Sequence, residues 1–187
     1  MIVKIFDLTT STKRLFISSF GRRSFAEKKS EMNTQEKFTS IHARWISPVF
    51  WALVFYIFGA GMMDGFAIYH TWRFVGEAEF VKMHIESGSR IIPFLVLPAL
   101  VMTIFLVLQF WHRPKAVSRR LLWIAVPCVV IPWLSSAFIQ IPMQFELDKG
   151  KDVELLNALI VSDWIRVVPT IILGAVVLIM MKKSITV

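Results

Sequence analysis

Apolar residues fall in four long runs along this chain, and short polar segments separate the runs. The runs cover residues 46–69, 91–111, 121–145 and 165–181. A helix rises about 1.5 Å per residue, so roughly 20 apolar residues cross a bilayer core about 30 Å thick. The pattern therefore predicts an all-α integral membrane protein, built as a bundle of four transmembrane helices.

Composition supports the membrane class. Hydrophobic residues make up 56% of the chain, and the mean hydropathy is +0.62, above the range of soluble proteins. A net charge of +8 could indicate nucleic-acid binding, but most basic residues flank the apolar runs, so we expect no nucleic-acid partner. The only cysteine, Cys128, lies inside the third run and is expected to be a small buried hydrophobe.

Residues 1–40 are polar, basic and rich in Ser and Thr, and they lack the apolar stretch of a signal peptide. We expect a disordered tail here, followed by the membrane bundle over 41–187. An organellar transit peptide is an alternative, although the acidic residues of this segment disfavour it. A second alternative is that Met32 is the true start.

Basic residues predict the orientation. Nine Lys and Arg precede the first run, and four lie in the loop 112–120, whereas the loops 70–90 and 146–160 hold three and two. Positive charge is retained on the cytoplasmic side, so both termini should be cytoplasmic, with the bundle in the inner (cytoplasmic) membrane. Nine of the thirteen acidic residues then lie at the outer ends of the helices.

Five polar residues lie at these outer ends within or beside the runs: Asp64, Gln140, Gln144, Asp163 and Arg166. Charged groups at such depth are costly without partners, so these side chains should meet one another, water or a ligand. Asp163 and Arg166 are three residues apart and can pair on one helix face. The hypothesis is a polar pocket open to the outside; the alternative is a structural network that locks the bundle.

The first outer loop adds His70, Glu79 and His84. Its second half predicts a short helix over 74–88, with Glu77 and His84 on one face. His, Glu and Asp are metal-ligand types, but no His-Glu-x-x-His or Glu-x-x-His motif is present, so metal and cofactor stay open. His70 and His112 are predicted at opposite membrane faces, which disfavours a haem.

Tryptophans lie mainly near the ends of the runs and predict an interfacial aromatic belt: Trp45, Trp51, Trp72, Trp111, Trp123, Trp133 and Trp164. The pair Gly61-x-x-x-Gly65 allows close helix approach, and it could form a face for a membrane partner.

Three motifs carry a family resemblance. They are Trp72-Arg-Phe-Val-Gly-Glu-Ala-Glu79-Phe80-x-x-x-His84, Gln140-Ile-Pro142-Met-Gln144 and Asp163-Trp164-Ile-Arg166. In order and spacing, residues 45–181 resemble a group of four-span bacterial membrane proteins without an established activity. That group is in turn distantly similar to the anthrone-oxygenase-like membrane proteins. The resemblance implies a four-helix bundle, with Glu79, His84, Gln144, Asp163 and Arg166 at the positions of the group's pattern.

Two functional classes follow. The first is a membrane enzyme, oxygenase-like or a proton-transfer catalyst, acting on a lipophilic aromatic or quinone-like substrate. His84 would then be the general base and Arg166 would stabilise an anion, with Asp163 and Glu79 assisting. Binding would involve Asp64, His70, Gln140, Gln144 and Trp164.

The second class is a non-catalytic membrane subunit or lipophilic-ligand-binding protein. A cavity lined jointly by His84 and Arg166 would favour the enzyme, and mutual hydrogen bonds without a void would favour the second class.

The charge asymmetry makes a topology prediction. A cysteine placed at Gly150 should react with an impermeant reagent in intact cells, and one at Ser118 should not. The reverse labelling pattern would overturn the orientation.

Overall fold

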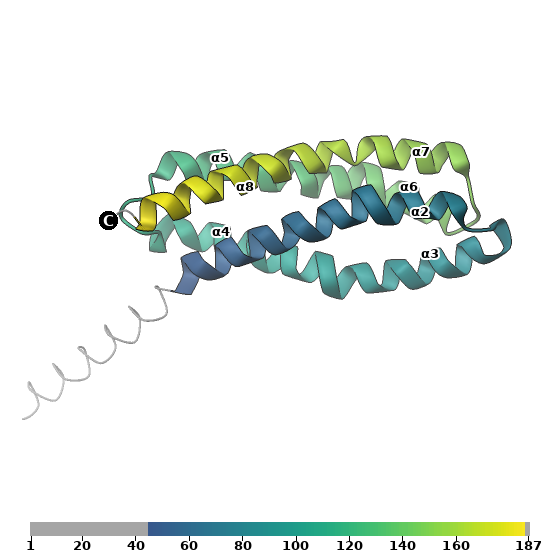
Figure 1. Cartoon of the computed structure of the whole chain (residues 1–187), viewed down its shortest axis with the longest axis horizontal. Helices are drawn as coiled ribbons and strands as arrows, with labels where there is room; N and C mark the ends of the chain where they lie inside the picture. The colour runs from purple at the N-terminus through teal and green to yellow at the C-terminus, as the bar shows by residue number, and fades with distance from the viewer. Residues whose placement is uncertain (1–44, 186–187) are drawn as a thin grey trace, which may run out of the picture. The chain divides into compact units, whose positions relative to one another are not determined.

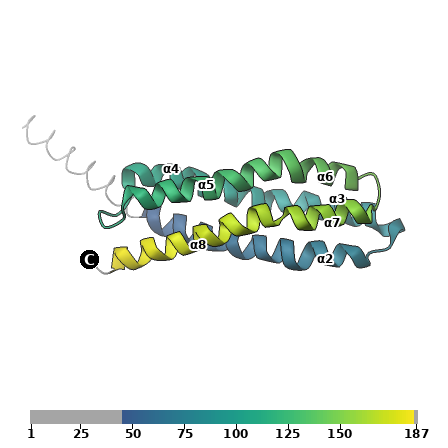
Figure 2. The ribbon, with the colours of Figure 1, turned by 90° about the horizontal axis from the view of Figure 1, so that it is seen from above.

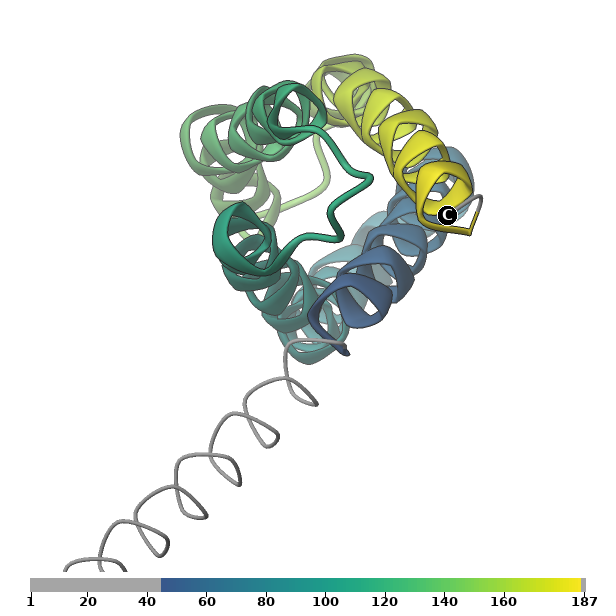
Figure 3. The same cartoon turned by 90° about the vertical axis from the view of Figure 1, so that its left-hand side faces the viewer.

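The computed structural model describes residues 45–185, and the predicted tail, including Met32, lies outside this range. Four long helices run side by side up and down the described bundle (Figure 1), and end-on they stand at the corners of a square (Figure 3). Residues 45–185 contain no strand. All four helices are long and apolar enough to cross a membrane: Trp45–Phe74, Glu77–His112, Arg119–Leu147 and Val153–Ile185. The all-α, four-helix prediction is confirmed.

Each long helix is a series of shorter segments. The first ends in a π turn (Asp64–Ile68), α2 (Tyr69–Thr71) and a 3₁₀ turn (Trp72–Phe74). The second comprises α3 (Glu77–Ile91), a π turn (Ile92–Val96) and α4 (Leu97–His112). The third comprises α5 (Arg119–Ser135), a π turn (Ser136–Gln140) and α6 (Ile141–Leu147), and the fourth α7 (Val153–Ser162) and α8 (Trp164–Ile185). The helix expected over 74–88 is therefore α3, and it continues into the membrane run.

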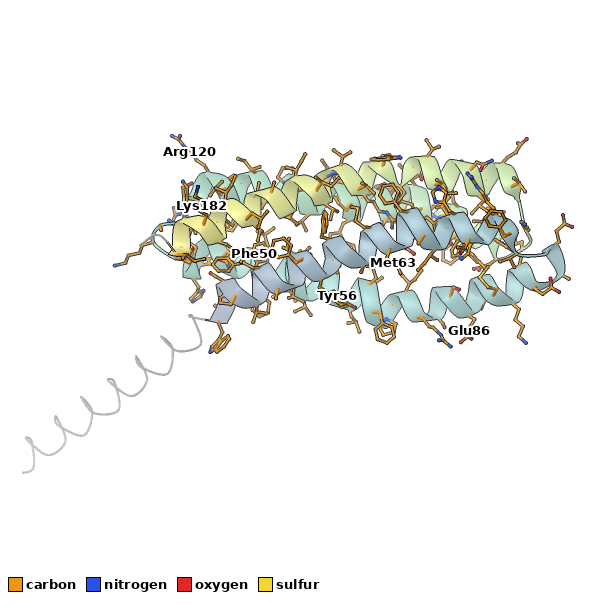
Figure 4. All side chains as sticks on the ribbon, viewed as in Figure 1. Phe50, Tyr56, Met63, Glu86, Arg120 and Lys182 are labelled. Atoms are coloured by element: carbon orange, nitrogen blue, oxygen red, sulfur yellow. The ribbon has the colours of Figure 1, made fainter. Side chains whose placement is uncertain are left out.

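A proline in the second helix is compensated by its neighbour. Pro98 has no backbone N–H, so the carbonyl of Phe94, four residues earlier, lacks its usual helical partner. The Tyr56 hydroxyl on the first helix donates to that carbonyl at 2.7 Å. Figure 4 shows Tyr56 where the first helix passes the second near the π turn. Freed carbonyls in membrane helices are commonly satisfied in this way.

Two apolar cores stabilise the bundle, one toward each end. Where α4, α5 and α8 lie together (Figure 2), one core consists of Phe50, Val54, Met102, Leu106, Val117, Leu122, Ala125, Cys128, Val129, Leu173, Val176, Val177 and Met180. The other core consists of Tyr69, Trp72, Phe80, Leu147, Leu156 and Leu159. Cys128 is buried, as expected. Between the two cores along the first, third and fourth helices lie buried polar residues: Asp64, Ser135, Gln140 and Asp163.

The exposed face of the second helix changes character near Arg90. α3 buries Phe80 and His84 and exposes charged residues, as a helix at a water-facing surface does. Glu86 projects outward in this part of Figure 4. α4 instead exposes large apolar side chains, a pattern typical of contact with lipid: Leu97, Leu100, Val101, Ile104, Val107 and Trp111. On this helix the exposed face therefore changes from charged to apolar near Arg90.

The tryptophans differ in exposure, and Trp51 and Trp133 are partly buried against the first core. Four are more than half exposed, as an interfacial belt requires: Trp45, Trp111, Trp123 and Trp164. Trp72 differs from the expectation, because only 2% of it is exposed. It packs against Tyr69 and Phe80, with ring centroids 5.0 and 6.4 Å away. Trp72 therefore belongs to the core beside α3 rather than to the lipid-facing belt.

The Tyr56–Phe94 bond makes a stability prediction. Tyr56→Phe should lower the free energy of unfolding in detergent by about 1 kcal/mol, because the Phe94 carbonyl loses its donor. In a Pro98→Ala background the restored backbone N–H can serve that carbonyl, so the same change should cost less. Equal costs in both backgrounds would show that the hydroxyl does not compensate for the proline.

Candidate functional site

A polar contact between Arg166 and Asp163 lies at the junction of α7 and α8. Arg166 Nε donates to Asp163 Oδ1 at 2.7 Å, and Nη2 donates to the same oxygen. Asp163 is 4% exposed. Arg166 N and Val167 N also donate to the Asp163 carbonyl, which starts α8 at this point. The predicted pairing of these two residues is confirmed, and it holds a buried carboxylate with a cation.

Arg166 also connects the fourth helix to the first. Its Nη2 donates to the Tyr69 hydroxyl at 3.2 Å and lies 3.9 Å from Asp64 Oδ2. Asp64 is 5% exposed, and its Oδ2 has no hydrogen-bond partner within residues 45–185. The π turn that starts at Asp64 places this side chain in the bundle interior. Arg166 is therefore the cation shared by two buried carboxylates.

The network continues to the second and third helices through Gln144. Its Nε2 donates to the Tyr69 hydroxyl at 3.4 Å, and its Oε1 lies 2.6 Å from His84 Nε2. His84 Nδ1 lies 2.7 Å from Asp148 Oδ1, just beyond α6. Both ring nitrogens of His84 therefore have an oxygen atom within hydrogen-bond distance, one from Gln144 and one from Asp148. Asp148 is the last residue in this series of hydrogen bonds, and 38% of its side chain is exposed.

His84 is enclosed by aromatic rings. The Phe80 ring stacks on it at 5.5 Å with an interplanar angle of 17°. The Trp72 ring meets it edge-on at 4.8 Å. His84 itself is 3% exposed. Two hydrogen bonds and two aromatic neighbours therefore hold the imidazole in place.

One continuous network thus links all four long helices, in the order Asp148, His84, Gln144, Tyr69, Arg166 and Asp163. His84 makes no direct hydrogen bond to Asp163 or Arg166 within the described residues; Gln144 and Tyr69 connect them. We call this set, together with Asp64, the outer network.

Two predicted site residues lie apart from the outer network. Gln140 is 2% exposed and donates to Ser135 Oγ at 2.9 Å and to the Ser162 carbonyl at 3.4 Å. It joins the third helix to the end of α7. Glu79 is exposed on α3, with its carboxylate turned back over Gly76, the residue before the helix. That position suits a carboxylate near a helix N-terminus and does not bring Glu79 to His84.

His70 and Trp164 line a small pocket beside the outer network. It has a volume of about 20 Å³, and Gly65, Phe66, Ile160, Asp163 and Val167 complete its walls. His70 Nδ1 lies 3.1 Å from the Gly65 carbonyl oxygen, which can only accept, so Nδ1 carries the proton. The Phe66 and Trp164 rings meet edge to face at 5.5 Å. A volume of this size has room for about one water molecule.

Gly65 sets how closely the first helix approaches Asp163. A Cβ added at Gly65 would lie 2.2 Å from Asp163 Oδ2, whereas one added at Gly61 would meet nothing within 4 Å. Within the described bundle, only Gly65 of the Gly61-x-x-x-Gly65 pair therefore allows a close approach between helices. Gly61 lies on the open side of the helix, and a partner at that face stays a prediction.

Sequence reasoning missed four residues of this site: Tyr69, Trp72, Phe80 and Asp148. Tyr69 ended an apolar run and Trp72 looked like a belt residue, so neither was marked as a polar or aromatic neighbour of His84. The helical spacing of Phe80 and His84 was a usable signal, since it places both rings on one face of α3. No group of three His, Cys, Asp or Glu residues suited to a metal ion occurs in the described range.

Comparisons with protein-family models, curated proteins and solved structures find no match for this chain. The family resemblance drawn from the motif order therefore stays a prediction, and the functional argument rests on the geometry of the described residues.

The contact at Gly65 gives a test with a matched control. Gly65→Ala should displace Asp163 from Arg166 and lower the free energy of unfolding by about 1–3 kcal/mol. Gly61→Ala should change it by no more than about 0.5 kcal/mol, because the added methyl group meets open space. Chemical unfolding in detergent measures both. Equal effects would mean that Gly65 does not set the approach of the two helices.

Proposed function

We propose that this chain is a non-catalytic integral membrane protein that binds a lipophilic molecule at the outer ends of its helices. The outer network serves as the lock that fixes these ends relative to one another. The observation that carries the proposal is the environment of His84, whose two nitrogens are both hydrogen-bonded and whose ring is covered by Phe80 and Trp72.

A general base must reach the proton that it removes, directly or through one water. His84 offers no free nitrogen for that purpose, and Arg166 is already engaged by Asp163, Tyr69 and Asp64. Pockets for drug-sized ligands usually measure about 300–1,000 Å³, far above the pocket beside His70. Mutual hydrogen bonding between these side chains therefore favours a structural role for them over a His84-driven reaction.

Lipid-facing side chains support a lipophilic ligand. Phe66 and Trp164 border the small pocket and are 51% and 52% exposed. A molecule dissolved in the bilayer could reach this seam between the first helix and α8 without crossing water. We propose that the seam lies at the extracytoplasmic face of the inner membrane, as the distribution of basic residues predicts.

The lock makes a prediction that separates the two functional classes. Arg166→Ala should lower the free energy of unfolding by about 3–5 kcal/mol, because two buried carboxylates lose their cation. Adding Asp64→Asn and Asp163→Asn to that variant should restore part of the lost free energy of unfolding.

Native mass spectrometry of the wild-type protein should detect a bound lipophilic molecule. The mass of that molecule should be the same before binding and after release.

The catalytic alternative predicts a different set of results. His84→Ala would then keep the stability of the wild type and abolish turnover of a phenol or quinone. These two results for His84→Ala, together with an Arg166→Ala variant that is as stable as the wild type, would overturn the proposal.

A further inference from the structure

Two residues that line the small pocket, His70 and Asp163, each have a hydrogen-bond acceptor that no described residue uses. Because His70 Nδ1 donates to the Gly65 carbonyl, a neutral His70 ring has its lone pair on Nε2. Asp163 gives Oδ1 to Arg166, and its Oδ2 lies over Gly65, which also lines the pocket. Neither His70 Nε2 nor Asp163 Oδ2 makes a hydrogen bond within residues 45–185. The pocket is therefore built to receive a donor.

Its remaining walls are apolar or aromatic. Phe66 and Trp164 stand at the exposed side, and Ile160 closes the side toward α7. A cation beside such rings gains from the negative face of the π system. A charged donor also binds a carboxylate more strongly than a neutral one, by roughly a factor of two. The walls and the carboxylate together favour an ammonium group over a hydroxyl group.

Position along the helix indicates where the rest of the ligand would lie. Glu154 and Asn157, the last exposed polar side chains of α7, precede Asp163, whereas the exposed residues on either side of it, Val161 and Ile165, are apolar. The pocket therefore lies at the level where polar headgroups meet acyl chains, if α8 crosses the bilayer. A head the size of one water fits the volume of about 20 Å³, and an apolar body would extend along the lipid-facing seam.

We infer that this pocket binds the primary ammonium head of a membrane amphiphile, with Asp163 Oδ2 and His70 Nε2 as acceptors. The inference rests on the proposed lipophile-binding function and names its ligand class. An aminophospholipid and a simple long-chain amine carry the same head, and the experiment distinguishes them.

The test measures thermal unfolding of the full chain in detergent with four added amphiphiles. These are phosphatidylethanolamine, phosphatidylcholine, dodecylamine and dodecanol. Phosphatidylethanolamine and dodecylamine should raise the unfolding temperature. Phosphatidylcholine lacks an N–H, and dodecanol lacks the charge, so neither should match them. A larger shift with the phospholipid than with the amine assigns the natural source to the lipid, and the reverse assigns it to a free amine.

Two variants connect the effect to the pocket. His70→Phe removes an acceptor, and Ile160→Phe fills the space without touching a polar group; each should abolish at least four-fifths of the shift. His112→Phe is the matched control, because His112 Nδ1 similarly contacts a helix carbonyl, that of Leu108 at 3.3 Å, away from the pocket. It should leave the shift unchanged.

The outcomes separate this inference from the function on which it rests. Equal shifts with dodecanol, or shifts that survive in Ile160→Phe, would overturn the ammonium site. If native mass spectrometry still detected another bound lipophile, the proposed function would stand. If no amphiphile shifted the unfolding temperature and no lipophile were retained, both would fail.

Discussion

A single guanidinium determines how the polar ends of this bundle can be buried. Arg166 bonds Asp163 on its own helix and reaches Tyr69 and Asp64 on the first. Without it, two carboxylates with exposures of 5% and 4% would lie next to apolar side chains, at a cost of several kcal/mol each. The sequence provides the cation three residues after Asp163, so the pair forms within one turn of helix. The contacts through Tyr69 and Gln144 to His84 extend outward from that pair.

Packing of the outer core depends on the same constraint. Tyr69 gives its hydroxyl to the outer network and its ring to the core that contains Trp72 and Phe80. His84 likewise has hydrogen bonds at both nitrogens and aromatic rings around them. An alternative polar arrangement would therefore have to move the aromatic core as well. The same helix, α3, carries Glu77, Glu79 and Lys82 on its exposed face.

The four helices could be predicted from the sequence because apolar runs of membrane length have few other solutions. The Asp163–Arg166 pair followed from helical spacing in the same way. The link from His84 to Arg166 could not be predicted, since it passes through Gln144 and Tyr69 on two other helices and depends on how those helices pack. Trp72 was misplaced in the lipid-facing belt for a related reason: composition near a helix end does not show whether a ring faces lipid or a neighbouring core.

The pocket beside His70 was equally hidden, although all of its polar residues had been marked as candidates. His70, Asp163 and Trp164 come from the ends of the first helix and α8, and only the close approach at Gly65 brings them to one volume. The charged residues organise the helix ends, and the exposed rings of Phe66 and Trp164 border the pocket beside them. This arrangement is the basis on which we propose binding of an amphiphile rather than chemistry at His84.

The central claim is that the outer network acts as one unit across four helices, and a double-mutant cycle between Tyr69→Phe and His84→Ala tests it most directly. The two side chains do not bond each other; Gln144 lies between them. If the network is one unit, their effects on the free energy of unfolding should be non-additive by about 0.5–3 kcal/mol. Additivity within about 0.3 kcal/mol would show that the contacts are independent and would contradict the account.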